Sequence, residues 1–468
     1  GMFGMGLLWL TFLNIFVGIF LAFVVFGKRT LIIGRKIGAN TFPEFLGKVY
    51  DSTFIRKFAA TIILCAMPLY AAAVMIGAAR FLESTLNMNY TMAVIIFAVI
   101  VAAYVMTGGI KGVFYTDAFQ GSIMFIGMLI LLFFTYNLLG GVSQAHNALT
   151  NLNQIIPASL AEKGHLGWTS MPAFGSEYWW VLVSTLVLGV GIGVLAQPQL
   201  IVRYLTVKGP KELNRAVVVG GIFIIAMTGI AFVVGALTNV YFYGATGKIA
   251  LLAAVDPVSG KPNIDLIIPM YINMALPPWF TYIFMLTLLS AAMSTLSGQF
   301  HSIGTSLGHD LSRRASLLIN RASILVALVV TVWLSFVLPP GIVAIATAIF
   351  FGICAATFLP AYAAALYWKR ATRPAAIASM VTGFGSSLLL IAFVHAKEAS
   401  ALGLSQLLFG RATLLGFPWT VVDPIVISLP LAALVMMAVS LVTAPATSHS
   451  PAAVLTETKK ARHAVNEG

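Results

Sequence analysis

Residues 289–300, LSAAMSTLSGQF, place hydroxyl and amide side chains inside a long apolar segment. Side chains such as Ser294, Thr295 and Gln299 gain nothing from burial in lipid, so their presence there needs a reason. On a helix, adjacent side chains such as Ser294 and Thr295 fan about 100° apart, and both hydroxyls can turn toward one point between helices. Hard cations prefer several oxygen ligands. These two hydroxyls and the carbonyl of Ala291 could therefore form part of a sodium site that needs no carboxylate.

The same hydroxyls also have a purely structural explanation. Serine and threonine in membrane helices donate hydrogen bonds to carbonyls of their own helix and pack against neighbouring helices. On these residues alone the structural interpretation is favoured. The ion-binding interpretation requires a facing segment that supplies further oxygens.

A candidate for that segment reads LGVGIGVLAQPQLIVRYL at 188–205. Gly189, Gly191 and Gly193 lower helix stability, and Pro198 removes a backbone donor and clashes with the preceding turn. Together they predict a break near the middle of a membrane span. Broken backbone is tolerated there only where it is buried in protein or lines a wet cavity. One interpretation is a binding site made of freed carbonyls and helix ends. The other is a proline kink with glycines that let two helices approach closely.

Carboxylates are absent from the middle of the apolar segments. Asp117, in GGIKGVFYTDAFQG, lies at the start of one segment and Asp423 at the edge of the last. An acidic residue near a helix start also complements the helix dipole, which is the structural interpretation of Asp117. His301, about two turns beyond Ser294, is interpreted as a hydrogen-bonded packing residue. Because proton-driven carriers usually need a titratable group in mid-membrane, sodium coupling is favoured over proton coupling.

The composition explains where these segments must lie. Of the 468 residues, 60% are hydrophobic and only 9% are charged, whereas about a quarter of the residues in a soluble protein are charged. Long apolar runs recur from end to end and predict an all-α, polytopic membrane protein with about eleven transmembrane helices. The expected spans are 5–26, 56–82, 90–107, 117–139, 179–205, 214–240, 276–308, 322–338, 341–367, 374–395 and 422–443.

The basic residues are distributed unevenly between the connections. Most of the 27 lysines and arginines fall in alternate connections, including 28–57, 203–215 and 459–462. This is the positive-inside pattern, so the basic side and the C-terminus are predicted to be cytoplasmic and the chain to lie in the plasma membrane. Since the excess positive charge orients the chain in a bilayer, nucleic acid is not an expected partner.

Three stretches together resemble the sodium:solute symporter family, whose members have a LeuT-like fold of two inverted five-helix repeats. The stretches are TGGIKGVFYTDAFQG (107–121), LGVGIGVLAQPQLIVRYL (188–205) and LSAAMSTLSGQFHSIGTSLGHDL (289–311). In addition, TFPEFLGKVYDS (41–52) is similar to the family's loop after its second core helix. The resemblance runs from the first span to the last and points to the bacterial and archaeal branch that includes proline and pantothenate carriers.

The resemblance implies roles for particular residues. The family's sodium site uses the backbone of an alanine and two hydroxyls in the pattern A-x-x-[S/T]-[S/T], which corresponds to Ala291, Ser294 and Thr295. The aspartate of the YTD motif, linked in the family to ion release or a further cation site, corresponds to Asp117. The broken helix that lines the substrate cavity corresponds to 188–200. The substrate-binding residues expected from this correspondence are Val190, Val194, Gln197 and Pro198.

The sequence departs from the family in two respects. In proline carriers a tryptophan and a tyrosine stand eight and four residues before the proline, whereas Val190 and Val194 occupy these positions here, so proline is a poor candidate substrate. The family also has two helices before the equivalent of 5–26, and the second of them, the first core helix, supplies further sodium ligands and much of the substrate pocket. We expect this helix to be missing from the chain. We therefore expect residues 1–443 to form an N-terminally incomplete transporter domain and 444–468 to form a disordered cytoplasmic tail.

The expected function is secondary active transport, in which sodium drives symport of a small organic solute by alternating access. The expected partners are sodium, a solute such as a carboxylate, amino acid or vitamin, and the lipid bilayer. A truncated, non-transporting membrane sensor or scaffold is the alternative, although the short tail leaves no room for a signalling kinase. An enzyme would require catalytic or metal-binding side chains clustered at one depth. The sequence contains no such cluster, so neither an enzymatic activity nor a cofactor is expected.

Overall fold

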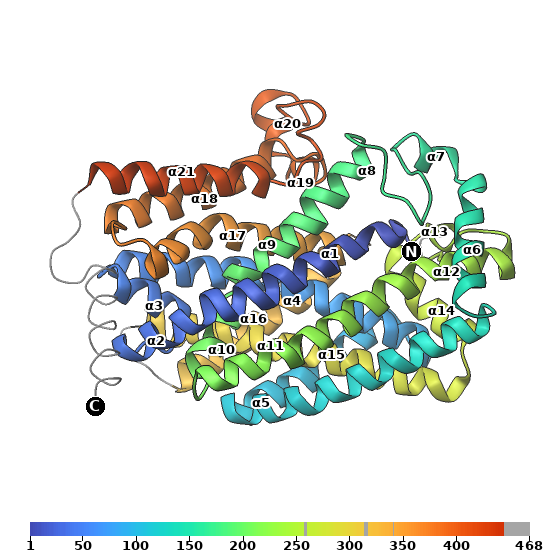
Figure 1. Ribbon diagram of the computed structural model, residues 1–468, viewed down its shortest axis with the longest axis horizontal. Helices are drawn as coiled ribbons and strands as arrows, with labels where there is room; N and C mark the ends of the chain where they lie inside the picture. Colours follow the sequence, from blue (N-terminus) through green and yellow to red (C-terminus); the bar gives the residue numbers. More distant parts are fainter. Residues whose placement is uncertain (257–259, 313–316, 340, 444–468) are drawn as a thin grey trace.

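The computed structural model describes residues 1–256, 260–312, 317–339 and 341–443, apart from the side chains of 107–114 and 317. Within these residues, ten helices are long and apolar enough to cross a membrane, and Tyr90–Met106 is a shorter apolar helix. The long helices run side by side along one axis (Figure 1). The predicted all-α membrane architecture is therefore confirmed. The ten are Gly4–Ile37, Thr53–Leu86, Tyr115–Leu138, Glu177–Thr206, Pro210–Thr246, Pro278–Leu311, Leu318–Val337, Val343–Tyr367, Arg373–Phe393 and Ile425–Val442.

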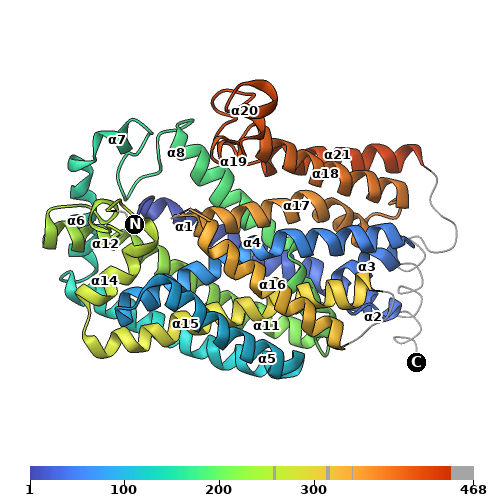
Figure 2. The ribbon, with the colours of Figure 1, turned by 180° about the vertical axis from the view of Figure 1, so that it is seen from behind.

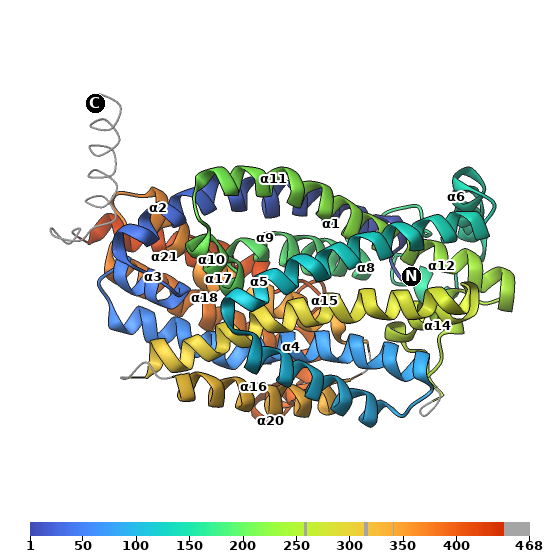
Figure 3. The same ribbon diagram turned by 90° about the horizontal axis from the view of Figure 1, so that it is seen from below.

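The helical elements form two groups on either side of the interrupted segment. In the first group, η2 (Asn14–Gly27) packs against α11 (Pro210–Ile224). In the second, α15 (Pro278–Thr305) packs against α4 (Thr53–Leu86) and α5 (Tyr90–Leu138), and α16 (Leu317–Val337) packs against α4. Figure 3 shows α11 on one side of the molecule and α4, α15 and α16 on the other. The interrupted segment that carries the candidate site lies between these groups.

The first span is longer than the predicted 5–26. Its helix continues through the basic stretch as α2 (Lys28–Ile37) and stops at Gly38, whose φ of 62° is left-handed. The continuation is amphipathic and buries Leu31 and Ile33. A Cβ added at Gly34 would lie 2.2 Å from a methyl carbon of Leu205, so this turn packs tightly against the helix that carries Leu205. The charged stretch is therefore helix rather than loop, because one of its faces is apolar and covered.

The predicted spans 90–107 and 117–139 are halves of a single helical element. Backbone helix runs without a gap from Tyr90 to Leu138. A straight helix of that length would far exceed the roughly 30 Å of a bilayer core. The two halves instead form the arms of a V in Figure 3. The separate connection expected between them is thus wrong. The glycines at 108, 109 and 112 give a stretch in which a helix can bend sharply without losing its backbone pairing.

Three C-terminal helices form a tightly joined layer, seen together in Figures 1 and 2. They are α17 (Val343–Tyr367), α18 (Arg373–Phe393) and α21 (Ile425–Val442). A Cβ added at Gly383 would lie 2.0 Å from the carbonyl oxygen of Ala356, so α18 touches the backbone of α17. Ser379 donates a 2.8 Å hydrogen bond to the carbonyl of Ala432 and joins α18 to α21. Small residues permit this close helix contact in the absence of a hydrophobic driving force within lipid.

Candidate functional site

The helix that was predicted to break is interrupted where glycine and proline meet. Its N-terminal part consists of α8 (Glu177–Trp180), η4 (Val181–Val190), α9 (Gly191–Gly193) and the 3₁₀ turn η5 (Val194–Ala196). Gln197 then adopts extended backbone with ψ of 118°, and α10 (Pro198–Thr206) begins with proline. Proline at the first helical position costs little, because the N–H it lacks would have no intrahelical partner. The predicted break is confirmed.

The predicted substrate-binding residues have different surroundings at this interruption. Val190 and Val194 are half-buried, and Val194 packs toward Gly18 of η2. Gln197 and Pro198 are buried. The amide of Gln197 donates a 3.3 Å bond to the carbonyl of Gly193, and its oxygen accepts a 3.0 Å bond from Gln199. In this conformation the valines are therefore the more accessible part of the interruption, while Gln197 holds its two sides together.

The predicted sodium ligands occupy one face of α15. Ala291, Ser294 and Thr295 are all half-buried. The hydroxyl of Thr295 donates a 2.9 Å hydrogen bond to the carbonyl of Ala291, four residues earlier. This is the back-bonding that polar residues in membrane helices commonly make. The carbonyl and the hydroxyl thus lie together, as a shared cation site requires, although each is paired with the other.

Ser294 has a partner that sequence reasoning did not assign to it. Its hydroxyl interacts with the carboxylate of Asp117 on α5. The same carboxylate forms a 2.9 Å ion pair with Arg203 of α10. The guanidinium of Arg203 lies against Gly298, where an added Cβ would be 3.7 Å from its nitrogen. Three helices therefore bring a hydroxyl, a carboxylate and a cation to one place.

This arrangement corrects the structural interpretation of Asp117. The residue does not lie at a helix start, because α5 is already helical well before it. Arg203 was missed as its partner because the two positions are 86 residues apart and no local pattern connects them. The only signal was that Arg203 follows the helix-breaking proline by little more than a turn of α10.

Several buried polar atoms on these three helices have no hydrogen-bond partner among the described residues. They are Asp117 Oδ1 and Gln120 Oε1 on α5, Gln199 Oε1 on α10, and Gln299 Nε2, Gln299 Oε1 and His301 Nε2 on α15. An unsatisfied buried polar group costs about 1–3 kcal/mol, so such groups are normally met by water, an ion or a ligand. The donor set is rich in oxygen and fits a hard cation. His301 was interpreted as a hydrogen-bonded packing residue, but its Nε2 has no hydrogen-bond partner among the described residues.

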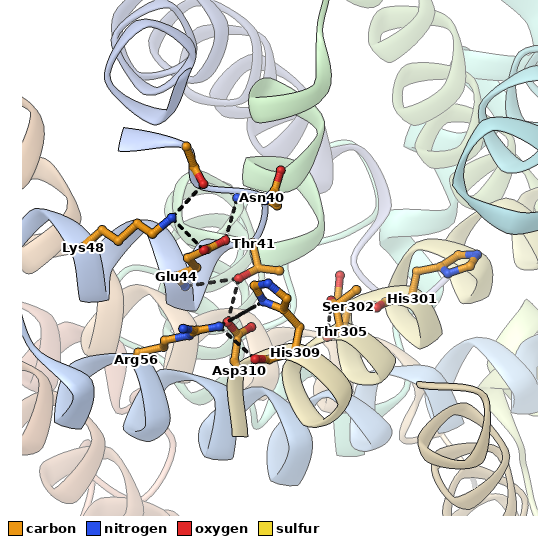
Figure 4. Close-up of polar contacts among 11 residues, drawn as sticks. Asn40, Thr41, Glu44, Lys48, Arg56, His301, Ser302, Thr305, His309 and Asp310 are labelled. Carbon is orange, nitrogen blue, oxygen red and sulfur yellow. Dashed lines mark hydrogen bonds and ion pairs between the residues drawn. The ribbon is translucent and has the colours of Figure 1, made fainter. Parts of the chain in front are cut away.

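A second polar cluster lies at the start of α3 (Phe42–Val49) and is drawn in Figure 4. The buried carboxylate of Asp310 pairs at 2.9 Å with Arg56, at the start of α4. Thr41 donates a second 2.9 Å bond to the same oxygen. Arg56 also donates to the carbonyl of His309 at 2.8 Å. This inner clasp joins α3, α4 and the end of η8 (Ser306–Leu311), and Figure 4 shows His301 pointing away from it.

An interrupted membrane helix, a hydroxyl pair on a facing helix and an ion pair that joins α10 to α5 are typical of a helical secondary transporter. The chain belongs to the sodium:solute symporter family, which it matches over residues 2–383. This confirms the family predicted from the sequence, and with it sodium-coupled symport of a small solute. The family is one of transporters and not of enzymes.

Individual relatives and a solved structure agree with this assignment. The chain is 29% identical to the sodium/pantothenate symporter of Haemophilus influenzae, over 80% of this chain and 73% of the relative. It is 27% identical to the sodium/pantothenate symporter of Escherichia coli, over 78% and 72% respectively. It is 26% identical to the osmoregulated proline transporter OpuE of Bacillus subtilis, over 84% and 77%. The structure is similar to that of a Na⁺-coupled sialic acid symporter, with a TM-score of 0.69 at 16% identity, over 94% of this chain and 84% of that one. The predicted LeuT-like fold is thereby confirmed.

Proposed function

We propose that this symporter binds its coupling sodium ion at Ala291, Ser294 and Thr295. The support is the position of these oxygens on α15. They lie beside the carboxylate of Asp117 and close to α10, the segment after the interruption. A sodium ion there would exchange part of its hydration shell for the carbonyl and the two hydroxyls. Asp117 would add negative charge that offsets the lost hydration, because charge interactions are stronger in a low-dielectric interior.

In this proposal, Asp117 and Arg203 govern release of the ion. The carboxylate can pair either with the guanidinium or with a cation that leaves the Ser294 hydroxyl. When Arg203 holds Asp117, as it does here at 2.9 Å, the carboxylate is a weaker ion acceptor. Separation of α10 from α5 would free the carboxylate to receive the ion. Ion movement and helix movement are then coupled, and such coupling is reciprocal between the two.

The solute is proposed to be a small carboxylate, with pantothenate as the first candidate. Two relatives are sodium/pantothenate symporters. Val190 and Val194 would line the solute site with apolar side chains, and Gln197 and Pro198 would shape the interruption. Val190 and Val194 stand where proline carriers have aromatic residues, which disfavours proline. The basic connections and the C-terminal side are proposed to face the cytoplasm of the plasma membrane; the predicted tail 444–468 lies outside the described residues.

Uptake into proteoliposomes tests this function. Radiolabelled pantothenate should accumulate when sodium is added outside, and an equal concentration of potassium should not support accumulation. Proline and sialic acid, assayed in parallel, should accumulate at most weakly. Pantothenate uptake that is the same in sodium and potassium would contradict sodium coupling. Strong proline uptake with no pantothenate uptake would overturn the proposed solute while leaving the sodium site intact.

Asp117→Asn should slow turnover more than it weakens solute binding. The amide keeps the size of the side chain but removes the charge that receives the ion and pairs with Arg203. We expect the maximal uptake rate to fall by about tenfold or more, which corresponds to a barrier raised by about 1.4 kcal/mol. Solute affinity should change less than threefold, which corresponds to less than about 0.6 kcal/mol of binding free energy. Initial rates over a range of solute and sodium concentrations separate the two effects. A change confined to solute affinity would refute a role in ion release.

A further inference from the structure

The connection between α18 and α21 places a carboxylate inside the protein. Asp423 is only 3% exposed. One carboxylate oxygen accepts a 2.9 Å hydrogen bond from the backbone of Ile425, at the start of α21. The backbone N–H of Asp423 donates a 3.0 Å bond to the hydroxyl of Ser184 on η4, and the neighbouring Thr185 interacts with the carboxylate. Asp423 thus ties the C-terminal layer to the N-terminal part of the interrupted helix.

Two glycines make room for this carboxylate. A Cβ added at Gly352 of α17 would lie 3.3 Å from one carboxylate oxygen, and a Cβ added at Gly189 of η4 would lie 3.7 Å from the other. The carboxylate therefore sits in the seam between η4 and α17. Capping alone requires only a hydrogen bond from a backbone N–H in the first turn of the capped helix. The position of Asp423 instead makes it a contact between two other helices.

The charged groups that face Asp423 are His395 and Glu398, at the start of α19 (Ala396–Leu402). They are hydrogen-bonded to each other. From the described parts of η4 and α17, hydroxyls and glycines face the carboxylate. Burial raises the pKa of Asp423 to about 7, although Ile425, His395 and Thr185 act to lower it. Burial acts to lower the pKa of His395, but Glu398 and Asp423 raise it overall.

We propose that Asp423 is a proton-binding site that latches η4, which precedes the interruption, onto α17. In the latched arrangement seen here the carboxyl is buried, and burial shifts its equilibrium toward the neutral, protonated form. When η4 separates from α17, water reaches the carboxyl and it becomes an ordinary acid that is ionised at neutral pH. A proton taken from the surrounding water therefore helps to hold the seam closed. The latch is independent of the proposed function.

The direction of the pH effect follows from the difference in the proton affinity of Asp423 between the latched and the open state. The latched state has a pKa of about 7, whereas the ordinary value is 3.8. Since the latched state binds the proton more tightly, lowering the pH below 7 favours the latched state, and raising it above 7 removes that preference. Between these two pKa values the latched-to-open ratio should rise about tenfold for each unit of acidification.

Hydrogen exchange of the purified full chain in lipid nanodiscs tests the latch without any solute. After correction for intrinsic exchange, backbone amides of Val181–Val190 should be about tenfold better protected at pH 6 than at pH 8. In Asp423→Asn the side chain is neutral at both pH values, so this difference should disappear. Glu162→Gln, which neutralises an exposed carboxylate in another connection, should behave like the unchanged protein.

Thr185→Val supplies a second measure if the asparagine variant does not fold. Loss of the hydroxyl that lowers the pKa of Asp423 should move the midpoint of the protection change to higher pH. A pH-independent protection in the unchanged protein would overturn the proposal. So would a pH dependence that Asp423→Asn and Thr185→Val both leave intact. A uniform loss of protection at every pH in Asp423→Asn, with the pH dependence kept, would show a cap of α21 and no proton latch.

Discussion

Replacing Ser294 and Thr295 together by alanine should abolish sodium-dependent uptake while the protein still folds. The change removes two oxygens, and each hydrogen-bond-like contact to a charged group contributes about 1.5–3 kcal/mol. The loss of both should weaken sodium binding by about 100-fold or more. The helix itself should tolerate the change, because alanine is the best helix former and both positions are only half-buried.

The measurement is the sodium concentration that gives half-maximal pantothenate uptake in proteoliposomes. Ser302→Ala is the matched control, because it removes a hydroxyl from the same helix whose one bond among the described residues is to the carbonyl of Gly298, at 2.9 Å. This control should keep the sodium dependence of the unchanged protein. Equal protein levels in the membrane must accompany the comparison. If the double variant retained its sodium dependence, the site would have to lie elsewhere.

Replacing Arg56 by alanine should destabilise the protein by about 3 kcal/mol. The carboxylate of Asp310 has no exposed surface, so the variant leaves a charge buried without its cation. Removing one partner of a buried ion pair typically costs about 3–5 kcal/mol, and the partial exposure of Arg56 places the expected value at the lower end. The free energy of unfolding, measured by reversible denaturation in mixed micelles, reports the effect.

The inner clasp also predicts how variants combine. Asp310→Asn removes the uncompensated charge, so the double variant Arg56→Ala/Asp310→Asn should be more stable than Arg56→Ala alone. Lys163→Ala is the control, because Lys163 pairs with Glu177 at 2.9 Å and both side chains are exposed. Exposed pairs of this kind contribute about 0–1 kcal/mol. A similar loss of stability in Lys163→Ala and Arg56→Ala would show that burial of the pair is unimportant.

The features of the fold that depend on local composition could be predicted from the sequence. Apolar runs located the spans, and glycines followed by Pro198 located the interruption, since both features act through the chain's own backbone. The sequence also placed Ser294 and Thr295 together on one helix. The partners of these residues were beyond such reasoning. Arg203 reaches Asp117 only because α10 and α5 pack against α15. Likewise, Asp423 lies at the edge of an apolar run in the sequence, and its burial depends on glycines in two distant helices.

The tight backbone contact between α17 and α18 shows that the folding unit extends beyond the residues that match the family model. The match to that model ends at residue 383, inside α18. The buried residues Ala375, Ala376 and Met380 of that helix belong to the same hydrophobic core as α17. A minimal transporter cut where the similarity stops would expose this surface and lose α21 and the carboxylate that reaches η4. The last two spans are thus integral to the assembly of the transport core.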